Sequence, residues 1–404
     1  MSESGGRRAS WYRPMRGRDS SEEGRTATPL ELLFDLSFVV AIAQLGTQLE
    51  HAVTEEHYGL GAMGFVFTFF AIWWAWMNFT WFASAYDTDD VPYRCATLVQ
   101  IAGVLVLAAG VPRAFSGLDF TVPILGYAVM RTALIAQWLR AAHQARHSVR
   151  RHTALRYAGG ITVAEAGWVA WLFMPDGWQL WWFLLLVIVE LAVPAYAEHY
   201  SLTPWHAHHI SERYGLFTII VLGESITAAT VGIQEALDGE GQARLGDLAA
   251  VVVGGLLIMF AMWWQYFSVP AHDLVRHRSQ RLLSLLAWGY GHVLVFAGAA
   301  AVGPGLVVAA NQALATNELD ARMAAAAVGL PTALYVLCVE FLQLRPYQRT
   351  PLLRWVFPAC AVLVLAAVFA PQPVLIMGIV MSLAVGVAVY GTGQTHAQEQ
   401  LVAD

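Results

Sequence analysis

The sequence contains twelve apolar runs, most of them about 20 residues long, the length that a helix needs to cross a bilayer. Lipid cannot hydrogen-bond free backbone groups, so a spanning segment must be a helix or part of a closed barrel. The runs lack the strict alternation of barrel strands, and the chain is 57% hydrophobic and 13% charged. We therefore expect an all-α polytopic membrane protein with about 12 transmembrane helices. The runs lie at 30–50, 60–84, 94–112, 121–142, 156–174, 178–198, 209–234 (which leaves room for a break), 247–269, 281–303, 322–344, 353–370 and 373–392.

One apolar pattern occurs twice in the same order. Residues 70–74 read FAIWW, and residues 260–264 read FAMWW, 190 positions later. Each pattern is followed by a short acidic loop, an arginine, and an apolar segment that begins and ends with glycine, at 103–110 and 291–298. Internal repetition constrains a fold strongly, because one unit is then built twice. The pattern predicts two parallel six-helix repeats, related by an axis near the membrane normal.

The repeat divides the chain into three parts. Residues 1–27 are polar and rich in Gly, Ser, Arg and Glu, which predicts a disordered cytoplasmic tail. This tail is not a signal peptide, because no apolar core follows its charges. Residues 28–200 are expected to form the first six-helix membrane repeat, and residues 205–395 the second.

The distribution of arginine predicts the orientation. All 23 basic residues are Arg, and six of them lie in the N-terminal tail. With that tail inside and twelve crossings, the arginine-rich loops fall on the cytoplasmic side and the acidic loops on the other, which is the positive-inside pattern. Both termini are therefore expected in the cytoplasm. The predicted cytoplasmic loops are 85–93, 143–155, 199–208, 270–280 and 345–352, and the opposite loops carry Glu50, Glu55, Glu56, Asp176, Glu235, Asp238 and Glu240.

Ionisable residues inside apolar runs are the best functional pointers, because burying an unpaired charge in a membrane is costly. In the first run, Thr28 and Pro29 suit a helix start, and Glu31 and Asp35 are four residues apart and so share a helix face. Two carboxylates this close suit a cation site or a proton-handling pair. The alternative is that Glu31 lies at the membrane interface, where the helix N-terminus favours it, while Asp35 pairs with an arginine.

The run at 209–234 carries Glu224 well inside an otherwise apolar span, so this carboxyl must be neutral, paired or facing water. In the repeat, Asp35 aligns with Glu224 at an offset of 189, whereas Glu31 aligns with Glu212 at an offset of 181. The first alignment agrees with the tryptophan pattern, and the second needs a longer loop. Arg213 is expected to pair with Glu212 or to cap the helix.

Histidines at the start of the same run are weak candidates for a metal site. His208, His209 and Glu212 have helical spacings of three and four, which could place three ligands on one metal ion. Histidines also gather at membrane interfaces, where they are solvated, so the sequence leaves metal binding open.

Four tryptophans lie inside their runs instead of at the ends. Trp73, Trp74, Trp263 and Trp264 either line a central interface or cavity, or simply pack in the helix bundle. Arg131 lies in a further apolar run and is a natural partner for a helix-embedded acid. Lesser candidates for polar sites are Asn78, Glu165, Glu190, His292 and Glu340.

Two strings resemble a known family. The chain reads TPLELLFDLSFVVAIAQL in the first run and HHISERYGLFTIIVLGESI near its middle. These strings resemble the ELFFDL-like first helix and the ERFGLF…LGES segment of the bacterial low temperature requirement protein A family (LtrA). The resemblance covers most of residues 28–395. It implies a multi-pass protein of the inner (cytoplasmic) membrane, and it implies little about activity.

The first run is also similar to the Phe-Ser-Asp helix of a potassium channel family built from two six-helix repeats. The similarity rests on the segment 34–38 with Ala41 and Ile42. Leu36 and Ser37 depart from the usual order of that motif, and the second half of the chain has no Phe-Ser-Asp.

The features above favour transport over catalysis. We expect a transporter or channel for a small solute or ion, with its pathway between the two repeats. Residues expected along it are Glu31, Asp35, Glu212, Arg213, Glu224, Trp73, Trp74, Trp263 and Trp264. The alternative is a membrane-embedded enzyme acting on a lipid or hydrophobic small molecule, with Glu212, Glu224 and the histidines as acid, base or ligands. No nucleotide loop or hydrolase motif is present, and the lack of lysine excludes Schiff-base chemistry. We expect the lipid bilayer as a partner, no nucleic acid and no cofactor.

Overall fold

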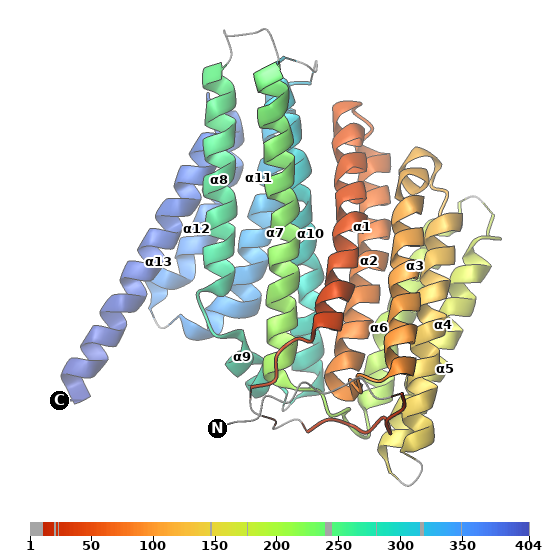
Figure 1. Ribbon diagram of the computed structural model, residues 1–404. Helices are drawn as coiled ribbons and strands as arrows, with labels where there is room; N and C mark the ends of the chain where they lie inside the picture. Colours follow the sequence, from red (N-terminus) through yellow and green to blue (C-terminus); the bar gives the residue numbers. More distant parts are fainter. Residues whose placement is uncertain are drawn as a thin grey trace. The chain divides into compact units, whose positions relative to one another are not determined.

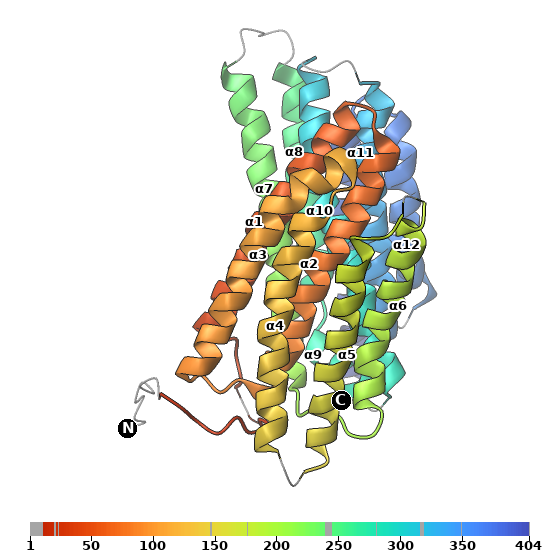
Figure 2. The same ribbon diagram turned by 90° about the vertical axis from the view of Figure 1, so that its right-hand side faces the viewer.

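The computed structural model describes residues 11–19, 22, 24–145, 148–175, 177–238, 245–279, 281–315, 319–348 and 350–403, and the regular elements among them are all helices (Figures 1 and 2). Short turns continue two of the helices: the π-helical turn Glu340–Leu344 and the 3-10 turn Arg345–Tyr347 follow α11, and the 3-10 turn Ala367–Phe369 follows α12. The helices are α1 (Pro29–Thr54), α2 (Tyr58–Tyr86), α3 (Val91–Gly117), α4 (Thr121–Gln144), α5 (Arg150–Trp171), α6 (Gln179–Glu198), α7 (Ala207–Asp238), α8 (Leu245–Phe267), α9 (Ala271–Arg278), α10 (Leu282–Ala313), α11 (Ala321–Val339), α12 (Pro351–Ala366) and α13 (Pro373–Ala403).

The helices follow the apolar runs of the sequence. Each of the twelve runs coincides with one helix, to within six residues at either end, except that α10 and α13 continue ten and eleven residues beyond the predicted ends. Among the described residues, ten helices are long and apolar enough to cross a membrane: α1 to α4, α6, α8 and α10 to α13. This confirms the all-helical membrane class. Helix α9 is an addition, eight residues long, within the predicted loop 270–280.

Helix α7 corrects one expectation. It runs without a break from Ala207 to Asp238, across the region where an interruption was left open. Glycines such as Gly215 and Gly223 lower helix propensity by roughly 1 kcal/mol each, but they keep their backbone N–H groups and therefore do not interrupt the helical hydrogen bonds.

The chain forms two compact units, each described here by itself. The first unit consists of Met1–Ala41, Phe70–Arg213 and Val275–Leu286. Within it, α3 packs on α4, α4 on α5, and α5 on α6 (Figures 1 and 2). The core of the unit is aromatic: Trp138 of α4 stacks on Tyr157 of α5 with ring centroids 4.2 Å apart, and the Phe82 ring meets Trp138 edge-on at 4.9 Å.

Glycines allow α3 and α4 to approach closely. A Cβ atom added to Gly126 would lie 2.4 Å from the backbone nitrogen of Leu107 and 2.6 Å from the carbonyl oxygen of Gly103. A Cβ atom on Gly103 would in turn lie 2.7 Å from the carbonyl oxygen of Gly126. Small residues at membrane helix interfaces allow such backbone contacts, which add dispersion energy where no hydrophobic effect is available.

The second unit consists of Ile42–Phe69, Tyr214–Leu274 and Ala287–Asp404. Helix α8 lies against α13, and α11 packs on α12 (Figure 1). Side-chain hydrogen bonds join α8 to α11: the Tyr335 hydroxyl donates to the Met262 carbonyl at 2.9 Å, and Gln265 Nε2 donates to the Val336 carbonyl at 3.1 Å. Buried polar side chains thus find backbone acceptors on the neighbouring helix.

A segment before α1 lies along the helix ends of the first unit. Arg25 is buried and donates to the carbonyls of Ala83 at 2.9 Å and Ser84 at 2.5 Å, where α2 ends. The backbone nitrogen of Arg13 donates to Asp90 at 2.8 Å. In the described part of the predicted tail 1–27, an arginine side chain thus satisfies helix-end carbonyls. Residues 1–10 lie outside the described residues.

Candidate functional site

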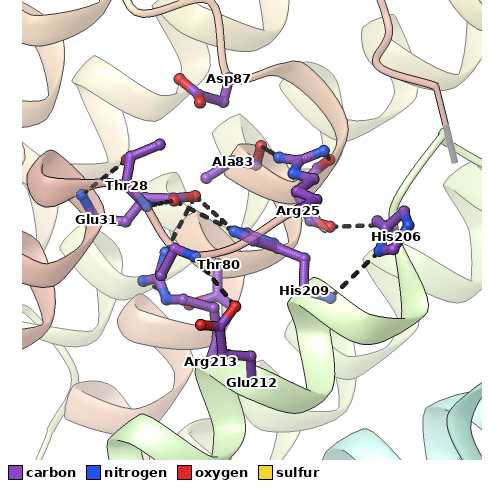
Figure 3. A network of polar contacts seen from close by, with 12 residues as sticks. Arg25, Thr28, Glu31, Thr80, Ala83, Asp87, His206, His209, Glu212 and Arg213 are labelled. Atoms are coloured by element: carbon purple, nitrogen blue, oxygen red, sulfur yellow. Dashed lines mark hydrogen bonds and ion pairs between the residues drawn. The ribbon is translucent and has the colours of Figure 1, made fainter. Parts of the chain in front are cut away.

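Three helical segments of the first unit bring acidic and basic side chains together in one buried cluster (Figure 3). We call it the Arg213 cluster. All its members are buried. They are Glu31 and Asp35 of α1, Trp76 and Thr80 of α2, and His209 and Arg213 of α7.

Glu31 caps the N-terminus of α1 and also contacts two basic side chains of α7. The Thr28 backbone nitrogen donates to Glu31 Oε2 at 2.7 Å, and the Glu31 backbone nitrogen donates to Thr28 Oγ1 at 3.3 Å. This reciprocal pair is a capping box, which satisfies two of the free N–H groups of a helix N-terminus. The same carboxylate lies 3.2 Å from Arg213 Nη1 and 3.2 Å from His209 Nε2. Glu31 therefore caps its helix, as the second sequence alternative predicted, and it also contacts Arg213, although that alternative assigned an arginine partner to Asp35 alone.

Asp35 lies one turn further along α1 and contacts the same arginine. Asp35 Oδ1 accepts hydrogen bonds from Arg213 Nη2 at 2.6 Å and from Trp76 Nε1 at 2.8 Å. Asp35 Oδ2 has no hydrogen-bond partner among the described residues, although its side chain is fully buried. A buried carboxylate oxygen without a donor is costly in free energy, and a proton or another small positive ligand bound to this atom would reduce that cost.

Arg213 is the centre of the cluster. Besides its two carboxylates, Nη2 donates to Thr80 Oγ1 at 3.2 Å, and the guanidinium lies 5.9 Å from the centre of the Phe79 ring. Its expected partner was the neighbouring Glu212, and the structure instead pairs it with α1. Arg213 and His209 are four residues apart, so one face of α7 meets Glu31 and Asp35.

Two of the three histidines near the start of α7, His206 and His209, are buried. His209 Nε2 contacts Glu31, and the His209 backbone nitrogen donates to His206 Nδ1 at 3.4 Å. The His206 backbone nitrogen donates to Ser84 Oγ at 3.0 Å, at the end of α2. Burial, and secondarily the positive charge of Arg25, lowers the pKa of His206. The lowered pKa favours the uncharged form of His206.

The metal candidates separate in the structure. The His208 side chain is exposed, whereas His209 is buried on Glu31. Glu212 accepts a hydrogen bond from the Ala27 backbone nitrogen at 3.1 Å. Within the described ranges, no group of three or more His, Cys, Asp or Glu side chains has a geometry that could hold a metal ion.

Glu224 belongs to the second unit and lines a pocket there. The pocket has a volume of about 440 Å³ and mixes apolar walls with polar side chains. Glu224 is half-buried. The polar lining consists of Thr47, Glu50, His51, Glu224, Thr227 and Asn311. Asp35 and Glu224 thus lie in different units.

The four tryptophans also divide between the units. Trp73 and Trp74 are buried in the first unit, where Trp74 Nε1 donates to Glu190 at 2.8 Å. Trp263 and Trp264 of the second unit are 42% and 38% exposed. The tryptophan pair is therefore buried in the first unit, where one indole donates to a carboxylate, whereas the matching pair of the second unit is partly exposed.

Sequence reasoning missed two members of the Arg213 cluster, Trp76 and Thr80. Both lie on α2, at positions four residues apart, so they share a helix face. The sequence offered a weak signal, because both are potential donors within an apolar run. It could not show that their face meets α1 and α7.

The described residues form helices, ten of them long and apolar enough to cross a membrane, with a buried ion-pair cluster among them, and this architecture defines a polytopic membrane protein. Comparison with known proteins gives its family. The chain belongs to the bacterial low temperature requirement A protein (LtrA) family, whose model matches residues 26–389. It is similar to an uncharacterized protein of Rhizobium meliloti (strain 1021), with 27% identity over 296 residues that cover 70% of this chain and 68% of that protein. No solved structure matches it.

Proposed function

We propose that this protein transports or conducts a small ion or solute across the inner membrane, and that the Arg213 cluster binds the proton or cation that accompanies transport. The observation that carries the proposal is Asp35 Oδ2, a fully buried carboxylate oxygen without a hydrogen-bond partner among the described residues. A purely structural ion pair would be expected to satisfy both oxygens of its acid, because an unsatisfied buried oxygen costs about 1–3 kcal/mol or more.

The charges of the cluster support this role. Two carboxylates, Glu31 and Asp35, face one guanidinium, Arg213. With His209 neutral, the cluster carries one negative charge more than it can compensate. A net charge buried in a membrane protein is costly unless a partner neutralises it. One proton or one monovalent cation at Asp35 would neutralise it, and release of that ligand would restore the charge.

We propose that the pocket of the second unit binds the transported ion or solute. Its side chains offer carboxylate, hydroxyl, amide and imidazole groups, with Glu224 on α7 and Asn311 on α10. A half-buried carboxyl at the wall of a polar pocket attracts cations and positively charged solutes. The substrate class we propose is therefore a small cation or a cationic solute.

We further propose that twelve helices cross the bilayer as two parallel six-helix repeats, 28–200 and 205–395, with both termini in the cytoplasm. Two similarities between the units support this. Trp74 of α2 contacts Glu190 of α6, and Gly254 of α8 lies against Gly378 of α13, so the second helix meets the sixth in each half. In addition, glycines line the contact between α3 and α4 and between α10 and α11.

The experiment is a charge-displacement measurement on proteoliposomes adsorbed to a solid-supported membrane. A step in external pH should produce a transient current as protons bind to the wild-type protein. Asp35→Asn should lose most of the displaced charge, because the amide cannot take up a proton. The matched control is Asp119→Asn, an acid-to-amide change on an exposed loop, and it should leave the current unchanged.

Steady currents under gradients of H⁺, Na⁺ and K⁺ then separate a channel from a carrier. Glu224→Gln should reduce the steady current, while it leaves the pH-step transient of the Arg213 cluster in place. Equal transients in wild-type protein and Asp35→Asn contradict the proposal. Stoichiometric zinc or iron in the purified protein would favour the alternative, a membrane-embedded enzyme.

A further inference from the structure

The first unit contains a second buried polar cluster, which shares no residue with the Arg213 cluster. Its centre is the ion pair between Arg131 Nη2 of α4 and Glu190 Oε1 of α6, at 2.7 Å. The Glu190 carboxylate is well satisfied. Its Oε1 also accepts from the Tyr127 hydroxyl at 3.1 Å and from Trp168 Nε1 at 3.0 Å, and its Oε2 accepts from Trp74 Nε1 at 2.8 Å.

Only part of the hydrogen-bonding capacity of Arg131 is used in these contacts. The residue is 2% exposed, and its Nη2 donates to Glu190 and to the Tyr127 hydroxyl. Its Nε and Nη1 atoms are buried and have no hydrogen-bond partner among the described residues. A guanidinium has five N–H donors, and leaving several of them unsatisfied inside a membrane protein is costly.

Glu165 of α5 has hydrogen-bond acceptors that lack donors, whereas Arg131 has donors that lack acceptors, among the described residues. Both of its carboxyl oxygens are covered and have no hydrogen-bond partner within the described ranges. The side chain lies within electrostatic reach of Arg131 and Glu190. Covered donors on Arg131 and covered acceptors on Glu165, without hydrogen-bond partners among the described residues, therefore lie within electrostatic reach of each other, and ordered water is the usual bridge between such groups.

We propose that Glu165 is a proton-binding carboxyl, linked to Arg131 through water and forming a second proton site of the protein. Glu190 already neutralises Arg131, so an ionised Glu165 adds an uncompensated negative charge to the cluster. Protonation of Glu165 makes the cluster neutral and turns the carboxyl into a donor as well as an acceptor. The step is the binding of one proton to one carboxylate oxygen.

The groups around Glu165 select a proton over a metal ion. Helix α5 packs against α4 and α6. Helix α4 presents Arg131 and Tyr127, α6 presents Glu190, and α2 presents the Trp74 indole. A metal cation would need several oxygen ligands and would be repelled by the guanidinium, whereas a proton needs one oxygen.

The test is infrared difference spectroscopy of the reconstituted full-length protein across a pH titration. A protonated carboxyl gives a carbonyl band that an ionised carboxylate lacks, and the band shifts in heavy water. Glu165→Gln should lose one such band from the wild-type spectrum, and the exposed control Asp119→Asn should keep it. An unchanged set of bands in Glu165→Gln overturns the proposal.

Two further variants test the charge argument if Glu165→Gln does not fold. Glu190→Gln removes the carboxylate that pairs with Arg131 and leaves the positive charge to act on Glu165, so the Glu165 band should titrate at lower pH. Arg131→Gln removes the positive charge, so a second carboxyl band should appear at neutral pH as Glu190 also takes a proton. A spectrum that is the same in both variants as in the wild-type protein contradicts the proposal. Because the measurement does not depend on flux, its result is separate from that for Asp35 and transport.

Discussion

At the scale of single residues, Arg213 supplies the positive charge that the two carboxylates of the buried cluster share. It contacts Glu31 and Asp35 from one guanidinium, and neither carboxylate has another arginine beside it among the contacts described above. Breaking a buried ion pair by removing one partner costs about 3–5 kcal/mol, because the remaining charge is left without compensation. Arg213 should therefore be needed for stability as well as for ligand binding.

Arg213→Met should lower the free energy of unfolding by about 3–5 kcal/mol, since methionine keeps apolar volume but leaves two acids unpaired. Thermal unfolding in detergent micelles measures the effect. Arg94→Met is the control, because Arg94 pairs with Asp89 at 2.7 Å on the surface, where such pairs are worth at most about 1 kcal/mol.

Adding Glu31→Gln and Asp35→Asn to Arg213→Met should recover much of the lost stability, because the unpaired charges are then gone. A triple variant that is no more stable than Arg213→Met would show that the arginine acts through packing and not through its charge.

Asp87 gives a pH-dependent prediction outside the membrane spans. Burial raises the pKa of Asp87 to about 6, with help from the negative charge of Glu31 and against the positive charges of Arg18 and Arg25. Arg18 Nη1 lies 3.6 Å from the carboxylate. The pKa of an unfolded aspartate is about 4, so the folded protein holds this proton more tightly. The resulting stabilisation is complete below pH 4 and is lost as the pH rises through 6.

Asp87→Asn should therefore become more stable relative to the wild-type protein as the pH rises from 5 to 8. The expected gain is roughly 1–3 kcal/mol, since each tenfold change in proton affinity corresponds to about 1.4 kcal/mol. Unfolding curves of both proteins at the two pH values measure it. A difference that stays constant or changes in the opposite direction would contradict the raised pKa.

Part of the Arg213 cluster was predictable from the sequence. The spacing of Glu31 and Asp35 places both on one helix face, and pairing of Asp35 with an arginine was one of the expected alternatives. The sequence could not select Arg213 among 23 arginines, because it lies 178 positions from Asp35 and its choice depends on helix packing. Arg131 was expected to pair with an embedded acid, and the structure identifies that acid as Glu190.

At the scale of helices, the sequence predicted positions well and contacts poorly. Hydropathy located the twelve long helices of the described residues, because lipid forces apolar segments of this length into helices. It missed α9, which is short and polar, since no apolar run marks it. Which faces meet depends on small residues such as Gly103 and Gly126, and a single sequence does not state their partners.

Gly126→Ala should destabilise the protein by about 1–3 kcal/mol, because the new methyl group would meet backbone atoms of α3 that cannot move away without separating the helices. The control is Gly159→Ala in α5, where an added Cβ meets nothing within 4 Å. That change should be neutral or stabilising by up to about 1 kcal/mol, as alanine favours a helix over glycine. Melting temperatures in micelles compare the two, and similar losses would contradict the close approach of α3 and α4.

At the scale of the whole molecule, family membership and helix content are established, whereas orientation stays a prediction. The arginine-rich loops 143–155 and 270–280 should be cytoplasmic, and the acidic connection at 55–57 should be periplasmic. Of the acidic positions on the other side, Asp176 and Glu240 lie outside the described residues.

Reporter fusions test this orientation. Alkaline phosphatase inserted at 55–57 should be active, because it folds only in the periplasm, and at 143–155 it should be inactive. Green fluorescent protein at either terminus should fluoresce, because both termini are expected inside. The reverse pattern at any one of these sites would change the number or direction of the crossings.

The segment before α1 bears on how this protein reaches its finished state in the cell. Its anchors are spread along the chain, from Ala83 to Asp90 and on to Glu212, which receives the Ala27 backbone nitrogen. The last of these anchors, Glu212, leaves the ribosome only after α1 to α6 have been made. The contact of Ala27 with Glu212 therefore forms later than the contacts with Ala83 and Asp90, and an affinity tag fused before α1 would compete with a late step of maturation.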